Sequence, residues 1–454
     1  MNLSLPQALF ESFSHITVPD IDQLNQAHQL PPVVSVRLNP IKPSKAFADA
    51  TPVPWCAQGR YLDQRPSFTA DPLLHAGCYY VQEASSMFLE HALTQVVDFT
   101  KRLMALDLCA APGGKSTLLA SLLNEQSLLL SNEVIPSRVS MLTENLTKWG
   151  QLNTWVCSND PKQFAPINNL FDIVLIDAPC SGSGLFRKMP DFVNDWDMDN
   201  VHLCSQRQQR IVHDIFPSVK EEGIMVYMTC SFCEEENEEM VDMILQQFDV
   251  DSCAIDIPAE WGIIETISQV QQGYGYRFFP HLLNGEGFFL ACFKKRTSGE
   301  KPNKIDPNRS RKNKTDLASL QSFVDTENKV GLLQNDHLML IEAAHAEYAE
   351  YFAQHLKLVK KGILCGKVIR GELIPEHELA MYAHLRRDIP AVDVNLEQAV
   401  RYLQREPIEI DCPAKGWFLL RYEGQSLGWI KNVGNRINNY YPSHYRILNK
   451  HILD

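Results

Sequence analysis

Three side chains that could carry out covalent chemistry follow two apolar segments of the sequence. Asp177 lies near the end of FDIVLIDAP (171–179) and Cys180 directly follows it, while Cys230 is the last residue of GIMVYMTC (223–230). Both segments have the composition of buried parallel strands, and the carboxyl ends of such strands meet at one edge of a sheet. We therefore expect the three side chains to converge there. A thiolate is both a nucleophile and a leaving group, and a nearby carboxyl can stabilise an adduct through hydrogen bonds.

The two cysteines also have interpretations that involve no catalysis. A cysteine at a strand end is often a small buried hydrophobic residue. Cys230 and Cys233 form C-x-x-C, a spacing that zinc and redox sites use. A zinc site needs about two further ligands, which no second C-x-x-C or paired histidine supplies, so we predict no metal site.

A second candidate site lies at LDLCAAPGGKST (106–117), where an acid and a Gly-Gly turn lead from a strand into a helix. Glu133 ends the next strand, where an acid can accept hydrogen bonds from ribose hydroxyls. A phosphate-binding loop would need Gly at position 109, which is Cys, and a dinucleotide site would need G-x-G-x-x-G. The acids at 107 and 133 suit a nucleoside without phosphate, such as S-adenosylmethionine. A glycine turn that only packs a helix is the structural alternative.

The elements that would position these residues alternate between strands and helices. Two further strands are predicted at RLMALDLCA (102–110) and SLLLSNEV (127–134). The helical patterns are KSTLLASLLN (115–124), SRVSMLTENLTKWG (137–150) and SQRQQRIVHDIFPSVKEEG (205–223). We expect the second helix to close on Gly150 and the third on Gly223. This alternation predicts an α/β fold with a mainly parallel, doubly wound sheet.

The flanking sequence predicts three further parts around a central domain at 101–297. Residues 1–100 combine a helical start, a proline-rich middle and an apolar stretch, as in a small appended α+β domain. A basic stretch with almost no apolar residues predicts a linker at 298–316, which could also touch phosphate. Residues 317–454 predict a C-terminal α+β domain. Its helical part is expected at 317–360 and its strands at CGKVIRGELI (365–374) and KGWFLLRYEGQSLGWIKN (415–432).

Composition excludes several classes of protein. The chain has 454 residues, 45% hydrophobic and 21% charged, as in globular proteins. It has no apolar run of about 18 residues and no secretory start, so we expect neither a membrane span nor export. Twelve dispersed cysteines are typical of a reducing cytoplasm. A net charge of −13 argues against indiscriminate coating of nucleic acid, although residues 415–450 interleave basic and aromatic side chains that suit RNA contact.

Several motifs, in one order, resemble the RNA cytosine-5 methyltransferases of the NOL1/NOP2/Sun superfamily. Within it, the sequence is most similar to the bacterial 16S ribosomal RNA methyltransferase F branch. The motifs are DLCAAPGGK (107–115), NE (132–133), DAPCSGSGLFRK (177–188), RQQ (207–209), VYMTCSFCEEENE (226–238), RFFPH (277–281) and GEGFFLACFKK (285–295).

The resemblance implies a class I, Rossmann-like methyltransferase domain with an RNA-binding segment before it and a PUA-like module after it. It implies S-adenosyl-L-methionine as cofactor and methylation of cytosine C5 in 16S rRNA through a covalent cysteine–C6 adduct. The same chemistry on tRNA, or an RNA-binding assembly factor with vestigial activity, are the alternatives. The expected protein is a cytoplasmic monomer that acts on ribosomal RNA or the small ribosomal subunit, with no membrane partner.

Residue roles follow from the same resemblance. Cys230 is the expected nucleophile, Cys180 helps to release the product, and the Asp177 carboxyl can hydrogen-bond the pyrimidine edge. Arg187 and Lys188 are expected to meet substrate phosphate, with a surface ion pair as the alternative. The expected cofactor-contacting residues are Cys109, Ala110, Ala111, Pro112, Gly113, Gly114, Lys115, Glu133, Asp160 and Asp177.

Overall fold

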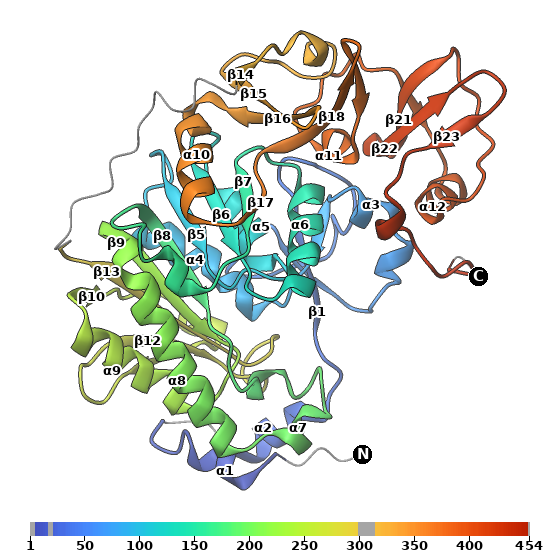
Figure 1. The fold of residues 1–454 in the computed structure, drawn as a ribbon. Helices are drawn as coiled ribbons and strands as arrows, with labels where there is room; N and C mark the ends of the chain where they lie inside the picture. Colours follow the sequence, from blue (N-terminus) through green and yellow to red (C-terminus); the bar gives the residue numbers. More distant parts are fainter. Residues whose placement is uncertain (1–4, 17–20, 298–313, 453–454) are drawn as a thin grey trace.

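The structure is a computed structural model that describes residues 5–16, 21–297 and 314–452 (Figure 1). Most of the predicted linker, 298–313, lies outside the described residues. Within them, no helix has both the length and the apolar character that a bilayer crossing requires.

Five parallel strands form the centre of a ten-stranded sheet (Figure 1). In spatial order they are β7 (Thr154–Cys157), β6 (Leu128–Asn132), β5 (Met104–Asp107), β8 (Phe171–Asp177) and β9 (Val219–Thr229). They are buried on both faces: on β8, Val174 and Ile176 join one hydrophobic core while Ile173 and Leu175 join the other. This confirms the predicted doubly wound sheet. Its winding direction reverses between β5 and β8, which is where such sheets bind ligands.

Antiparallel strands extend this centre on both sides. Next to β9 lie β13 (Phe288–Lys295), β12 (Tyr274–Phe278) and β11 (Ile264–Ile267), and β10 (Val250–Ser252) pairs with β13. On the opposite edge, β17 (Leu358–Lys360) pairs antiparallel with β7, although it belongs to the C-terminal third of the chain. The alternation of strands and helices alone does not predict these additions.

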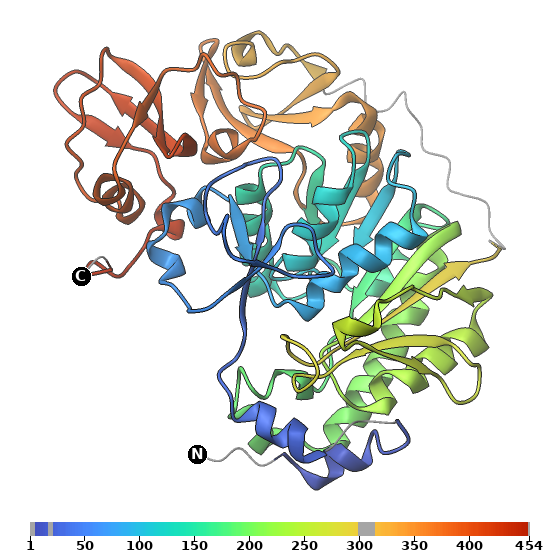
Figure 2. The ribbon, with the colours of Figure 1, turned by 180° about the vertical axis from the view of Figure 1, so that it is seen from behind.

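Helices cover both faces of the sheet (Figures 1 and 2). One face packs against α8 (Met198–Ile215), α9 (Glu238–Gln247) and α10 (Ala346–His355), which meet in one hydrophobic core. The other face packs against α4 (Phe88–Val96), α5 (Gly114–Leu122) and the end of α6 (Pro136–Trp149). A short helix, α7 (Phe192–Asp195), precedes α8.

One of the two predicted helix ends is correct. Helix α6 ends before Gly150, whose φ of 85° lies in the left-handed region that glycine adopts without strain. The expectation that the next helix closes on Gly223 is wrong, because α8 ends at Ile215 and a 3-10 turn with Pro217 follows. Proline has no N–H with which to continue a helix. The residues after it already belong to β9.

The prediction that residues 317–360 are helical is wrong for most of the segment. It contains a β-hairpin, β15 (Lys329–Gln334) and β16 (His337–Glu342), and only α10 is an α-helix there. The hairpin turns at Asn335 and Asp336, with φ of 49° and 63°. Both residues tolerate the left-handed conformation that a tight two-residue hairpin turn requires.

The N-terminal part forms a four-stranded sheet with short helices. Its strands, in the order β2-β3-β1-β4, are Thr51–Pro52, Gly59–Leu62, Val34–Leu38 and Tyr79–Val81. Its helices are α1 (Gln7–Glu11), α2 (Ile21–His28) and α3 (Pro72–His75). Helix α3 packs against α12 (Leu396–Gln404), so the N-terminal and C-terminal parts share a hydrophobic core (Figure 2).

The C-terminal part contains two sheets. The first comprises β14 (Lys314–Thr315), β15, β16, β18 (Ile363–Ile369) and β19 (Glu372–Pro375), and helix α11 (His377–Met381) follows it. The second comprises β20 (Ala391–Asp393), β21 (Gly416–Tyr422), β22 (Gln425–Asn432) and β23 (Ile437–Asn439). The strands predicted at 365–374 and 415–432 are therefore confirmed.

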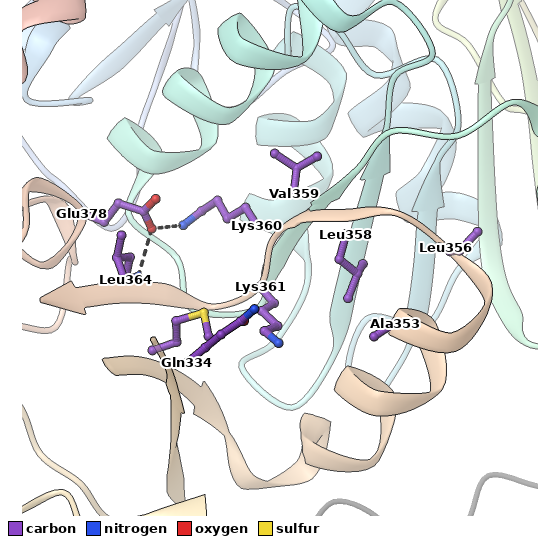
Figure 3. A pocket seen from close by; sticks show the side chains of 10 residues that line it. Gln334, Ala353, Leu356, Leu358, Val359, Lys360, Lys361, Leu364 and Glu378 are labelled. Carbon is purple, nitrogen blue, oxygen red and sulfur yellow. Dashed lines mark hydrogen bonds and ion pairs between the residues drawn. The ribbon is translucent and has the colours of Figure 1, made fainter. Parts of the chain in front are cut away.

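The C-terminal part is attached to the central sheet through α10 and β17. A cavity of about 440 Å³ lies beside this attachment and is lined from β15, β16, α10, β17, β18 and α11. Figure 3 shows the side chains that line it. Lys360 forms an ion pair there with Glu378, and that carboxylate also accepts the backbone N–H of Leu364 at 3.0 Å. This cavity contains none of the predicted site residues.

Candidate active site

The glycine loop lies at the reversal point of the sheet. Strand β5 ends at Asp107, and α5 begins at Gly114 after Gly113, whose φ is 115°. The loop borders a cavity of about 180 Å³. The residues that line the cavity are Tyr80, Val81, Gln82, Glu83, Ser86, Asp107, Cys109, Ala110, Ala111, Pro112, Gly114, Lys115 and Asp177.

Asp107 is the buried acid of this cavity. Its Oδ2 accepts a hydrogen bond from Ser116 Oγ at 2.6 Å, and its Oδ1 has no partner among the described residues. Burial raises the pKa of Asp107 to about 7. A buried carboxylate oxygen without a partner is costly, so this oxygen is suited to a ligand that brings a hydrogen-bond donor or a positive charge.

Lys115 connects the glycine loop to the predicted catalytic edge. Its Nζ lies 2.9 Å from Oδ2 of Asp177, at the end of β8. Burial lowers the pKa of Lys115, but the Asp177 carboxylate outweighs that effect and holds the pKa above its ordinary value. Lys115 also interacts electrostatically with Cys230, so a fixed positive charge faces the predicted nucleophile.

The two predicted catalytic cysteines are in contact. Cys180 Sγ and Cys230 Sγ are 3.1 Å apart, and the backbone N–H of Cys230 lies 3.4 Å from Cys180 Sγ. Both residues are half-buried, so neither sulfur is sealed in the core. The hydrogen bond with Cys230, together with burial, raises the pKa of the Cys180 thiol well above its ordinary value. The Cys180 thiol is therefore held in its protonated form.

Glycine allows the two cysteine loops to approach each other. The N–H of Gly184 donates to the carbonyl of Cys230 at 2.8 Å, and the carbonyl of Gly184 accepts from Gly287 at 3.1 Å. A Cβ at position 184 would lie 2.8 Å from the Cys230 carbonyl oxygen and 2.5 Å from that of Gly287. A larger residue at 184 would therefore separate the loops that bring the sulfurs together.

A buried network behind the cysteines was not predicted from the sequence. Glu236 is fully buried, and its carboxylate accepts from the N–H and hydroxyl of Ser181 and from Gln208 Nε2, at 2.6–3.0 Å. Tyr227 donates to Oε1 of Gln208 and interacts with the carbonyl of Glu236. The network fixes the loop that carries Cys180. Gln208 and Glu236 belong to the RQQ and CEEENE motifs of the sequence. A run of acidic residues does not reveal which of the glutamates is buried.

Arg187 does not occupy the position predicted for it. Its side chain is 3% exposed, and its Nε lies 2.9 Å from Oε2 of Glu286 while its Nη2 donates to the carbonyl of Gly285 at 2.7 Å. Arg187 therefore forms a buried ion pair instead of the expected contact with substrate phosphate. The alternative expectation, an ion pair on the surface, is also wrong because the pair is buried. Lys188 is exposed, as a phosphate contact would require.

Of three further residues predicted to contact the cofactor, only one lines the cavity beside the glycine loop. Cys109 lines the cavity, and burial raises the pKa of its thiol. Glu133 follows β6 and is buried, where its Oε1 accepts the N–H of Ile135 and its Oε2 lies 3.5 Å from Arg138. Asp160 follows β7, caps a 3-10 helix and lies 3.7 Å from Arg210. Neither Glu133 nor Asp160 lines the cavity.

The second cysteine of the C-x-x-C pattern is structural. Cys233 is fully buried in a core to which α1 contributes. In the same core, Phe13, which follows α1, packs near Phe232. Within the described ranges, no group of three or more His, Cys, Asp or Glu side chains is arranged to hold a metal ion.

The N-terminal part supplies one wall of the cavity, which the sequence did not predict. Tyr80, Gln82 and Glu83 follow or belong to β4 and line the cavity opposite the glycine loop. The contact is close, since a Cβ on Gly114 would meet Cε1 of Tyr80 at 3.3 Å. The apolar stretch CYYVQEASSM was visible in the sequence, but its position beside Gly114 depends on tertiary packing.

Comparison with known protein families gives three matches in chain order. A family described as "N-terminal domain of 16S rRNA methyltransferase RsmF" matches residues 5–84. "16S rRNA methyltransferase RsmB/F" matches residues 94–294, and "Methyltransferase RsmF PUA domain" matches residues 389–447. The central match contains the glycine loop and both cysteines of the candidate site.

Relatives in sequence and structure agree with these matches. The chain is similar to the ribosomal RNA small subunit methyltransferase F of Vibrio cholerae serotype O1, with 30% identity over 97% of each chain, and to that of Erwinia tasmaniensis, with 28% identity over 96% of each. A solved methyltransferase homologue from Pyrococcus horikoshii is 25% identical, with a TM-score of 0.52, over 64% of this chain and 100% of that one. NSun6 from the same organism, solved with SFG, is 17% identical, with a TM-score of 0.53, over 65% and 100%.

The solved structures confirm the predicted class I methyltransferase fold. The family match confirms S-adenosylmethionine as the cofactor. Identity at this level over nearly the whole length of both chains shows that the protein belongs to the ribosomal RNA small subunit methyltransferase F family.

Proposed function

We propose that the protein methylates C5 of cytosine in 16S rRNA through a covalent adduct between Cys230 and C6 of the base. One observation supports this chemistry above the others. Cys230 Sγ lies 3.1 Å from Cys180 Sγ at the sheet edge where Lys115 bridges Asp177 to the glycine loop. The proposed enzyme is a cytoplasmic monomer, with an RNA-binding segment at 1–100 and an RNA-binding domain at 317–454.

The residues of the cavity fit S-adenosylmethionine. Asp107 offers a buried oxygen without a partner, and Gly113 and Gly114 bring the backbone close to any ligand. The proposed cofactor contacts are the loop 109–115 and Asp177, with Glu133 and Asp160 at the ends of the next two strands. When bound, S-adenosylmethionine supplies an electrophilic methyl group.

The chain's own residues account for the remaining chemistry. Cytosine C5 becomes nucleophilic only after a group adds to C6, which is the role proposed for the thiolate of Cys230. Lys115 forms an ion pair with Asp177 and interacts electrostatically with Cys230, so its ammonium belongs to the same edge of the sheet as the proposed nucleophile. Asp177 can accept a hydrogen bond at the pyrimidine edge while it also accepts from Lys115. Once C5 carries the methyl group, the C5 proton is lost to solvent and the C6–S bond breaks, which returns its electron pair to Cys230 as the thiolate and releases the base. Cys180 takes part in this release by donating a hydrogen bond from its thiol to the departing sulfur.

The C-terminal surface supports an RNA substrate. Trp417 and Tyr440 lie with their ring centroids 4.4 Å apart, and Lys431 Nζ lies 4.9 Å from the Trp417 ring. Accessible aromatic and basic side chains together suit unpaired bases and phosphates. Trp429 and Tyr441, in contrast, are fully buried and belong to the core. The names of the relatives point to small-subunit rRNA as the RNA in question.

The proposal is tested with purified protein and S-adenosylmethionine carrying a tritiated methyl group. We expect label in 16S rRNA or small subunits and none in tRNA, and mapping of 5-methylcytidine should locate it at one or a few cytosines. Label in tRNA alone would show that the substrate assignment is wrong. No label in any RNA, with RNA binding retained, would identify a binding factor with a vestigial site.

A pH dependence follows from Asp107. Because burial raises its pKa to about 7, Asp107 is mostly protonated in the free protein at pH 6. A cationic ligand favours the carboxylate, so its binding should release a proton below pH 7. The dissociation constant of S-adenosylmethionine should therefore fall as the pH rises from about 5 to 7, by up to tenfold per pH unit, and level off above that. Calorimetry at pH 6 in two buffers of different ionisation enthalpy measures the released proton.

Two controls isolate this effect from other titrations. S-adenosylhomocysteine shares the amino acid and the adenosine but lacks the sulfonium charge, so it should release less proton. Asp107→Asn should remove the release, although Asp177, Glu133 and Lys115, which also influence Asp107, are unchanged. A heat of binding that is the same in both buffers for the unmodified protein would contradict the prediction.

A further inference from the structure

Arg37 of the N-terminal part reaches the helix that begins at the glycine loop. It lies on β1, is 1% exposed, and its Nε donates to Oε1 of Gln82 at 2.9 Å. Its Nη2 donates to Oγ1 of Thr117 at 2.6 Å and lies 3.4 Å from the carbonyl of Gly114. The guanidinium also lies over the ring of Trp149, 4.6 Å from its centroid. One side chain thus joins the N-terminal sheet to α5 and α6.

Thr117 continues this connection to the loop itself. Its Oγ1 accepts from Arg37 and donates to the carbonyl of Gly113 at 2.9 Å. The carbonyl of Gly113 also accepts the Thr117 N–H at 2.8 Å. Gly113 is the residue whose left-handed φ sets the turn, so the chain of hydrogen bonds ends at the point that determines the loop's conformation.

The opposite end of the connection forms the other wall of the cavity. Gln82 accepts from Arg37, donates to Ser86 Oγ at 3.2 Å, and lines the cavity with Tyr80 and Glu83. Glu83 is held by the N–H groups of Ser85 and Ser86, each at 2.9 Å. Both walls are therefore attached to Arg37, one through Gln82 and one through Thr117.

Stability alone does not explain a cation at this position. Among the described residues, no carboxylate lies within ion-pair distance of Arg37, and burial lowers its pKa to about 10. Glu90 interacts with Arg37 electrostatically but not as a direct ion pair. A buried cation without a direct ion pair is unfavourable, and an apolar side chain of similar length would fill the same space without that penalty. The partners of Arg37 that are hydrogen-bond acceptors all lie on Gln82 or on α5.

We propose that Arg37 is a positioning residue of the cofactor site, and that the N-terminal part thereby forms part of that site. Arg37 sets the separation between Gln82 and the glycine loop, so the cofactor finds a cavity of the correct width before it binds. The inference rests on the proposed role of the 109–115 loop in cofactor binding. It extends that role to residues outside the methyltransferase domain.

The test measures binding of S-adenosylhomocysteine to full-length variants by calorimetry, without RNA. Arg37→Met should raise the dissociation constant about tenfold, since it removes the charged hydrogen bonds to both walls. Thr117→Val should raise it about fivefold by removing the hydroxyl that relays to Gly113, and Thr117→Ser should restore it to within about twofold. The double variant of Arg37→Met and Thr117→Val should be no weaker than Arg37→Met alone, because both changes break one connection.

Lys42 provides a matched control. It is another buried cation of the N-terminal part, and it donates to the carbonyl of Lys148 at the last turn of α6, away from the glycine loop. Lys42→Met should leave the dissociation constant within about twofold of the unmodified value, since it breaks a contact of the same kind without touching the cavity. Equal weakening by Lys42→Met would overturn the proposal, because any loosening of the N-terminal part would then suffice.

Further outcomes separate this inference from the proposed cofactor site. Gly113→Ala places a side chain at a φ of 115° and should weaken binding if the loop holds the cofactor. Should Gly113→Ala weaken binding while Arg37→Met does not, the Arg37 inference is wrong and the loop assignment stands. If neither variant weakens binding, the loop assignment itself is wrong. Should Arg37→Met fail to fold by circular dichroism, the comparison of Thr117→Val with Thr117→Ser decides the question.

Discussion

Replacing Cys230 by alanine is expected to lower kcat for methyl transfer about 10⁴-fold or more, because it removes the sulfur proposed to add to C6 of the base. Cys180 lies 3.1 Å away, but its raised pKa keeps it protonated and makes it a poor substitute nucleophile. Methyl transfer is measured as tritium in RNA under single-turnover and multiple-turnover conditions.

Cys233→Ala serves as the matched control for this experiment. It removes the other sulfur of the C-x-x-C pattern, which is fully buried three residues from the nucleophile. We expect it to lower stability by creating a small cavity, while kcat stays within a few-fold of the unmodified enzyme. The Cys230→Ala protein should bind S-adenosylhomocysteine normally. If Cys230→Ala protein turned over at the unmodified rate, the nucleophile would have to be a different group.

Replacing Cys180 by alanine is expected to trap the enzyme on its RNA. Adduct formation needs only Cys230, whereas release needs removal of the C5 proton before the C6–S bond can break. The sulfur of Cys180 is 3.1 Å from that of Cys230, so it lies next to any ring bonded to Cys230. The variant should therefore transfer about one methyl group per enzyme and then accumulate a protein–RNA species that survives denaturing electrophoresis.

The double variant of Cys180→Ala and Cys230→Ala shows whether the trapped species is the proposed adduct. Without Cys230 no bond to C6 can form, so the denaturation-resistant species should disappear even though RNA still binds. Continued multiple turnover by Cys180→Ala, with no trapped species, would remove Cys180 from the release step. It would leave the proposal for Cys230 intact, because the two roles involve different bonds.

Much of the candidate site was predictable because its residues follow the ends of parallel strands. Asp107, Asp177 and Cys230 each come at the end of a buried parallel strand, and such ends meet at one edge of a sheet. Apolar runs followed by Gly-Gly or Ser-Gly turns revealed those ends without any knowledge of packing. The contact between Cys180 and Cys230 is one consequence of this topology, and Gly184 makes the approach close enough.

Other features could not be predicted because they depend on partners distant in sequence. Arg187 looked like an exposed phosphate contact, but Glu286, 99 residues further along, buries and neutralises it. The sequence predicts a helix where the hairpin at 329–342 lies, since the apolar residues fit either pattern and only the turn at Asn335 and Asp336 distinguishes the two. Local periodicity carries no information about such partners.

The sequence by itself determined the class of fold, the alternation of strands and helices in the central domain, the glycine loop and the pair of cysteines, because these depend on local patterns and on the direction of parallel strands. Only the tertiary structure decided which part of the chain completes the cofactor cavity. Tyr80 and Gln82 line it from the N-terminal part, Arg37 connects Gln82 to α5, and β17 from the C-terminal part extends the sheet. Such contacts arise when the hydrophobic surfaces of distant segments are buried against one another. The local sequence of a segment shows that it has an apolar surface, but not which other segment will cover it.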